Sequence, residues 1–274
     1  VSARPWIDNK SLPSTVPVRF LSSDQVPILA YLTLPRAEPK STERPPLVLL
    51  VNNWTANIGI FDELQERQYS IFDEHAKFLA SRGYAVLRIN HRGRHGFGEK
   101  FILDATTELV VDDVIYGLDY LSEKGVIDSS RVCILSSSES VGLAILAATR
   151  KGDVRCIVAI GTYFTVESVR SFDRRIWRRN AGVTEVEVAK AASDVLTEID
   201  FPILAVNQQN DKFGEDSFYG AFSKIPGLTF FHVPNMLKYE LRVKIYKKVT
   251  EFLAINLGSA QVEGQQPSTT PLMR

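Results

Sequence analysis

The stretch Arg131-Val132-Cys133-Ile134-Leu135-Ser136-Ser137-Ser138-Glu139-Ser140 sets the fold class of this 274-residue chain. Its apolar first half, 131–135, predicts a buried strand, and the polar tract after it leads into a helical pattern over 140–150. A second apolar run, Cys156–Ile160, predicts another strand. A strand, a helix and a strand in this order predict parallel pairing through a right-handed crossover.

The same alternation continues on both sides of this unit. Further strands are predicted at 16–21, 28–34, 47–51, 85–89, 203–206 and 229–233, and further helices at 69–82, 109–124, 216–223 and 239–255. In the last helix, one apolar stripe is formed by Leu241, Ile245, Val249, Phe252 and Ile255. The first two strands are too close together for a crossover, so we expect them to be antiparallel. The pattern predicts an α/β fold with a mostly parallel sheet of about eight strands and helices on both faces.

Composition at the two ends suggests the domain boundaries. Residues 1–15 predict an arm or linker, and residues 259–274, rich in Gly, Ser, Gln, Thr and Pro, predict a disordered tail. Between them, 16–258 predicts one domain with a helical insertion at 164–197, which carries five arginines between Arg170 and Arg179. This insertion is either a lid that receives an anionic group above the strand ends or a pair of solvated helices whose charges are balanced by nearby carboxylates.

Charge and apolar content exclude several classes of protein. The chain has 32 Lys plus Arg and 32 Asp plus Glu, so it lacks the basic excess that nucleic-acid binding uses. Its apolar runs are far shorter than the roughly 18 residues of a membrane span, and we expect a soluble protein. The sequence begins at Val1 without a charged leader before an apolar segment, so we expect any targeting peptide to be absent from it.

Cysteine and histidine usage gives no sign of a metal or cofactor. The two cysteines, Cys133 and Cys156, both fall in predicted strands, and we expect two buried free thiols. No acidic cluster predicts a metal site, and no motif predicts a cofactor.

The stretch 78–93, Phe-Leu-Ala-Ser-Arg-Gly-Tyr-Ala-Val-Leu-Arg-Ile-Asn-His-Arg-Gly, continues through Gly96-Phe97-Gly98 and resembles the corresponding segment of the prolyl oligopeptidase family of serine peptidases. The likeness extends through Asp113-Val114, 125–128 and 131–134, resumes at 202–204, and covers about residues 16–258. It implies the α/β-hydrolase fold and a catalytic triad in the chain order Ser, Asp, His.

The resemblance places the nucleophile at Ser138, in the turn between the strand that ends near Leu135 and the next helix. The family's Gly-x-Ser-x-Gly elbow here reads Ser136-Ser137-Ser138-Glu139-Ser140, so both glycines are replaced. Each replacement costs about 1 kcal/mol of backbone strain and alters the aim of the hydroxyl. Without a catalytic role, the tract is a polar turn in which Ser138 or Ser140 caps the following helix.

The resemblance places the acid at Asp211 and the base in the loop after the last strand. That loop reads Val233-Pro234-Asn235-Met236-Leu237-Lys238-Tyr239, in which Lys238 occupies the expected histidine position. Without an imidazole, the Ser138 hydroxyl lacks a group that takes its proton and returns it to the leaving group. Asp211 is alternatively a turn residue, and Lys238 is either a surface lysine or, with a pKa lowered by burial, the base of a Ser-Lys pair.

The remaining histidines are poor substitutes for the missing base. His232 is predicted in the last strand and His75 in a helix, while His91 and His95 follow the fourth strand and approach the site only from its rim. Strand packing is the better interpretation of His232.

The turn after 47–51 is altered as well. Where the family has a small-residue turn whose amides bind the oxyanion, this chain has Asn52, Asn53 and Trp54. Loss of one such donor costs roughly 3 kcal/mol of transition-state stabilisation, and the Trp54 ring tends to fill the space for an acyl group.

Three altered parts of one site lead to our preferred hypothesis, a noncatalytic or strongly impaired homologue that binds a small molecule, a peptide or a protein. The predicted pocket residues are Asn52, Asn53, Trp54, Ser138, Glu139, Asp211 and Lys238. The alternatives are an active serine hydrolase in which Lys238 or a relocated histidine activates Ser138, and a structural subunit of a larger assembly.

Overall fold

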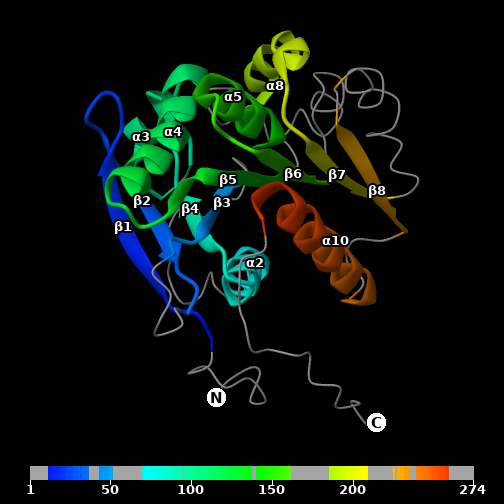
Figure 1. Cartoon of the computed structure of the whole chain (residues 1–274). Coiled ribbons are helices and arrows are strands. Elements are labelled where there is room, and N and C mark those ends of the chain that lie inside the picture. Colours follow the sequence, from blue (N-terminus) through cyan, green and yellow to red (C-terminus); the bar gives the residue numbers. More distant parts are fainter. Residues whose placement is uncertain are drawn as a thin grey trace.

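The computed structural model describes residues 12–36, 43–51, 70–94, 96–137, 140–161, 185–208, 225, 227–234 and 239–258. Each of the eight predicted strands is present, with ends shifted by three residues or fewer. The strands are β1 (Thr15–Leu21), β2 (Pro27–Thr33), β3 (Pro46–Val51), β4 (Ala85–Ile89), β5 (Asp128–Ser137), β6 (Cys156–Ile160), β7 (Ile203–Gln208) and β8 (Leu228–Val233). They form one sheet in the order β1-β2-β4-β3-β5-β6-β7-β8 (Figure 1).

Strand direction follows the length of the connections. The tight turn from β1 to β2 makes this pair antiparallel, as predicted, and β2 is also antiparallel to β4. All pairs from β4 to β8 are parallel. The carboxyl ends of β3 to β8 therefore lie at one edge of the sheet, where ligands bind in open α/β folds.

Helices cover both faces of the sheet (Figure 1). One layer contains α3 (Glu99–Leu103), α4 (Thr107–Glu123), α5 (Val141–Lys151) and α8 (Glu185–Asp194), and the other contains α2 (Ser70–Ser81) and α10 (Tyr239–Leu257). In β3, Leu47 and Leu49 belong to the apolar cluster of the first layer, while Val48 and Leu50 belong to that of the second. This period of two explains why the central strands read as continuous apolar runs.

Close packing fixes α4 on this sheet. Gly117 of α4 lies against Ile89 of β4, and a Cβ at this position would overlap the Ile89 side chain. Thr106 starts the helix by accepting a hydrogen bond from the Leu109 amide (3.2 Å).

The predicted apolar stripe of α10 is wrong at its end. Ile245, Val249 and Phe252 are buried as expected, but Ile255 is 81% exposed. Leu253 and Leu257 are buried in its place. Two successive steps of three, from Val249 through Phe252 to Ile255, turn the helix by about 120° away from the buried face, whereas steps of four stay close to it.

Only the end of the predicted insertion is described. In α8, Val188 and Ala192 are buried in the cluster shared with α5, so this helix belongs to the sheet-covering layer. The arginines from Arg170 to Arg179, the predicted helix at 216–223 and the predicted tail at 259–274 lie outside the described residues.

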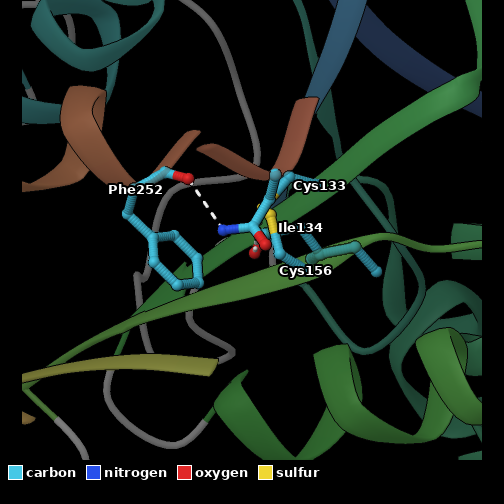
Figure 2. Close-up of a disulfide and its surroundings, with 5 residues drawn as sticks. Cys133, Ile134, Cys156 and Phe252 are labelled. Carbon is cyan, nitrogen blue, oxygen red and sulfur yellow. Dashed lines mark hydrogen bonds between the residues drawn. A yellow bond between two sulfur atoms is a disulfide. The ribbon is translucent and has the colours of Figure 1, made fainter. Parts of the chain in front are cut away.

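Our prediction of two free thiols is wrong, because Cys133 and Cys156 are joined by a disulfide (Figure 2). The two residues are direct partners in the register of β5 and β6, with Cα atoms 4.8 Å apart. The sequence placed both in strands but gave no strand register, and register is what brings the two sulfurs together.

Among the described residues, no helix has the length and apolar character needed to cross a membrane.

Candidate active site

The predicted site residues follow directly on the carboxyl ends of parallel strands. β3 ends at Val51, β5 at Ser137, β7 at Gln208 and β8 at Val233. The residues that follow them, Asn52, Asn53, Trp54, Ser138, Glu139, Asp211 and Lys238, lie outside the described part of the chain. Since these strands run in parallel, the connections that carry the candidates all leave the sheet at one edge.

The register of the strands shows where polar side chains enter at this edge. Val51, Ile89, Ser136 and Ala159 are register partners across β3, β4, β5 and β6. One step further, Asn90 follows β4 and Ser137 ends β5. Ile160 and Val206, which continue the Ser137 row into β6 and β7, are apolar. Asn207 and His232 are partners in the same region of β7 and β8. Polar side chains thus enter near the carboxyl ends of β4, β5, β7 and β8, at the edge where open α/β folds bind ligands.

Ser136, which replaces the first elbow glycine, is accommodated inside the sheet. It is fully buried, and its Oγ donates to the Val51 carbonyl (3.2 Å). The bond joins the ends of the two strands that lead into the candidate oxyanion turn and the candidate nucleophile turn.

The turn around Ser138 keeps the strand-to-helix arrangement that the resemblance implies. β5 ends at Ser137 and α5 begins at Val141, with Ser140 in the N-cap position. Ser140 is buried, but its side chain makes no cap hydrogen bond to the helix. Helix capping by the Ser140 side chain, one of our alternatives for this tract, is therefore wrong.

A buried ion pair that sequence reasoning missed holds the chain beyond β4. Arg92 donates from Nη2 to Asp113 Oδ1 (2.7 Å) and from its backbone amide to Asp113 Oδ2 (2.8 Å). Ser22 donates to the same carboxylate, and Arg92 Nη1 pairs with Asp24 (both 2.5 Å). Asp113 and Arg92 were both in the stretches that carry the resemblance, but the sequence did not indicate that they are partners.

The ion pairs in this cluster shift the pKa values of their members toward the charged forms. Burial alone lowers the pKa of Arg92, but the hydrogen bonds and charges of Asp113 and Asp24 outweigh it and raise the pKa above its usual value. Burial raises the pKa of Asp24, and the hydrogen bond and charge of Arg92 reverse this effect and lower it. Arg92 is therefore a fixed cation whose charge is met by carboxylates, and its role is structural.

The described histidines lie in ordered packing positions. His232 is in β8 as predicted, with its ring stacked on Phe230 (centroids 5.9 Å apart). His91 is fully buried and its Nδ1 donates to the Arg92 carbonyl (2.7 Å). His75 lies in α2 against Tyr246 of α10 (centroids 5.0 Å apart). His95 lies outside the described residues.

No group of three or more possible metal ligands occurs among the described residues.

Comparison with known proteins identifies relatives of one kind. Residues 70–191 match the model of the prolyl oligopeptidase family. Dipeptidyl aminopeptidase BIII of Pseudoxanthomonas mexicana is 33% identical over 147 residues, which cover 50% of this chain and 20% of that protein. Acylamino-acid-releasing enzyme 1 of Oryza sativa subsp. japonica is 30% identical over 107 residues, which cover 34% of this chain and 14% of that protein.

Solved structures show the same fold. The acylaminoacyl peptidase of Pyrococcus horikoshii superposes with a TM-score of 0.71 at 17% identity, over 97% of this chain and 45% of that one. A puromycin-hydrolyzing peptidase of Mycobacterium tuberculosis superposes with a TM-score of 0.74 at 18% identity, over 93% of this chain and 41% of that one. The matches thus span a fifth or less of the two curated relatives and less than half of these two solved chains. Taken together, residues 70–191 match the prolyl oligopeptidase family, and the chain shares the α/β-hydrolase fold of the solved peptidases.

Proposed function

We propose that this chain is a noncatalytic or strongly impaired member of the family, which binds a ligand at the carboxyl edge of its sheet. The observation that carries this proposal is the content of one loop. β8 ends at Val233 and α10 begins at Tyr239, so the loop consists of Pro-Asn-Met-Leu-Lys at 234–238 and contains no histidine. A base must come within about 3 Å of the serine hydroxyl, directly or through one water.

The positions of the three histidines in the described part of the chain support the proposal. His232 lies within β8, three strands from β5. Adjacent strands are about 4.8 Å apart, so roughly 14 Å of sheet separates His232 from the strand that leads to Ser138. His91 is fully buried just past β4, two strands from β5, and His75 lies in α2, in the helical layer on one face of the sheet.

Peptides are the ligand class we favour. The matched relatives are named for dipeptidyl and acylamino-acid release, and a homologue that keeps the fold and loses the base retains the surface around the strand ends. A small-molecule ligand or a protein partner at the same edge is a further possibility within this proposal.

One observation favours the alternative of an active serine hydrolase. The strand-turn-helix arrangement around Ser138 is kept, with β5 and α5 separated by only three residues. In that case the base is Lys238 or a relocated histidine, and Lys238 must be neutral to accept a proton.

Reaction with a fluorophosphonate probe separates the two functions. We expect no labelling of the wild-type chain above the level of Ser138→Ala, because the probe reacts only with an activated serine. Ser137→Ala is the matched control, as it removes a neighbouring hydroxyl. Labelling that is abolished by Ser138→Ala and retained in Ser137→Ala contradicts the proposal. If Lys238→Ala also abolishes this labelling, the base is Lys238; if it does not, the base is a relocated histidine.

Ligand binding is tested in parallel by calorimetry with short peptides that carry free or acetylated amino termini. We expect binding that Trp54→Ala weakens at least about tenfold, since buried aromatic anchors dominate such sites. Absence of binding for both peptide types contradicts the peptide-binding part of the proposal.

A further inference from the structure

The disulfide links the two central strands of the parallel sheet. Cys133 lies on β5, which leads into the turn of Ser138, and Cys156 lies opposite it on β6. Their Cα separation of 4.8 Å falls in the usual range for disulfides. The bond therefore joins the strand that carries the candidate nucleophile turn to its neighbour.

α10 lies over this bond. Both cysteines are fully buried and belong to the apolar cluster that also contains Val249, Phe252 and Leu253 of α10. Figure 2 shows Phe252 beside the cysteine pair. α10 contacts β5 and β6, and a hydrogen bond from Asn256 Nδ2 to the Phe252 carbonyl (2.8 Å) lies within this part of the helix.

The polypeptide order connects α10 to the candidate site. α10 begins at Tyr239, directly after the loop that contains Lys238. Movement of the first turns of α10 away from the sheet would displace that loop, whereas the strands on which the Ser138 turn is built stay joined by the disulfide.

We propose that α10 is a cover that protects the Cys133–Cys156 disulfide from thiols. The bond is exchanged only when α10 detaches from the sheet, and it keeps β5 and β6 paired during that opening. This makes the disulfide a protected structural cross-link of the site scaffold. The inference rests on burial and packing and is independent of whether Ser138 is catalytic.

The chemistry defines what must reach the bond. A thiolate attacks one of the two sulfurs, the Cys133–Cys156 bond breaks, and the other cysteine leaves as a thiolate. A second thiol then resolves the mixed disulfide, so that two small thiols become one small disulfide and the protein gains two cysteine thiols. Because attack requires contact with a sulfur, the fully buried bond reacts only after opening.

The first measurement establishes the bond itself. The chain is refolded with oxidised glutathione, denatured without reductant, and treated with iodoacetamide before mass spectrometry. We expect no adduct, and two adducts after prior reduction. Two adducts without reduction overturn the proposal.

The second measurement tests the cover. Dithiothreitol is added under native conditions and the rate of thiol appearance is compared between the wild type, Leu253→Ala and Ile255→Ala. Leu253 is fully buried in the apolar cluster that contains both cysteines, whereas Ile255 is exposed on the same helix. We expect reduction at least about tenfold faster in Leu253→Ala, since loss of buried contacts favours opening, and a rate within twofold of the wild type in Ile255→Ala.

Equal rates in all three chains overturn the proposal, as does reduction of the wild type as fast as that of the urea-unfolded chain. If Leu253→Ala does not fold, the wild-type rate is followed in urea below the unfolding transition. A urea dependence weaker than that of global unfolding supports local detachment of α10. A dependence equal to that of global unfolding contradicts it.

Discussion

Arg92 and Asp113 form a buried ion pair that is joined by several hydrogen bonds. The Asp113 carboxylate accepts from the Arg92 guanidinium, the Arg92 backbone amide and the Ser22 hydroxyl. Through these bonds, one side chain of α4 fixes the turn between β1 and β2 and the chain that leaves β4. The pair therefore links three segments that are far apart in the sequence.

Replacing Asp113 with Asn is expected to destabilise the fold by about 3–5 kcal/mol, because it leaves the Arg92 guanidinium buried with only the partly exposed Asp24 as a counter-charge. The free energy of unfolding in urea measures this cost. The matched control is Asp119→Asn on the same helix, where Asp119 is 41% exposed and pairs with Lys151 (3.1 Å), which keeps Asp153 as a second partner (3.3 Å). Its expected cost is below about 1 kcal/mol. If both variants lower the free energy of unfolding equally, burial of the Arg92–Asp113 pair contributes nothing to it.

Among the helices, α2 and α10 meet at an aromatic contact that contains a titratable group. The ring of Tyr246 in α10 touches both His75 and Phe78 of α2, with centroid distances of 5.0 and 4.6 Å. Burial lowers the pKa of His75 to about 4, and the positive charge of Arg242 acts in the same direction. The folded chain therefore holds His75 in its neutral form.

Stability is expected to fall on acidification through this contact. In the unfolded chain the His75 pKa is near 6.5, so between about pH 6.5 and 4 the unfolded state binds a proton that the folded state does not. The contribution of His75 to the free energy of unfolding is complete above pH 6.5. It decreases by up to about 2 kcal/mol between pH 7 and pH 5. Urea unfolding at the two pH values measures the loss, and His75→Phe, which keeps a ring against Tyr246, is expected to reduce it.

The carboxylates with altered pKa values titrate outside this interval. Burial raises the pKa of Asp24, but its hydrogen bond and charge interaction with Arg92 lower it below 3.8 overall. The Ser130 hydroxyl is the largest influence on Asp128 and lowers its pKa as well. Their contribution to stability is lost only below about pH 4. An equal loss between pH 7 and pH 5 in the wild type and in His75→Phe would exclude His75 as the source.

The elements themselves were largely predictable from local patterns. Apolar runs gave every strand, since both faces of the central strands are buried, and spacing gave α2, α4, α5 and α10. α3 was missed because its five residues are too few to show a period, and none of them is buried. Ile255 was assigned to the wrong face, as a periodic pattern alone does not show where a helix turns away from the sheet.

The arrangement of the whole molecule was harder to predict than its parts. Sequence order predicted parallel crossovers, but the position of β4 between β2 and β3 and the pairing of Cys133 with Cys156 depend on contacts between distant segments. The same holds for Arg92 and Asp113. For the candidate site, the resemblance gave residues that follow the ends of four parallel strands. The side-chain positions of those residues lie outside the described chain, so their roles stay predictions.

Because the parts of the site come from different strands, we expect that one substitution does not restore hydrolase activity. Lys238→His supplies a base after β8 but leaves the elbow after β5 unchanged. When catalytic groups act as a unit, the effects of their substitutions on the rate are strongly non-additive. Fluorophosphonate labelling of Lys238→His is expected to stay at the level of Ser138→Ala. The triple variant Lys238→His, Ser136→Gly, Ser140→Gly is expected to label measurably faster, and Ser138→Ala in that background to abolish the gain. Rapid labelling of Lys238→His alone would mean that the rest of the site is intact and that only the proton carrier is missing.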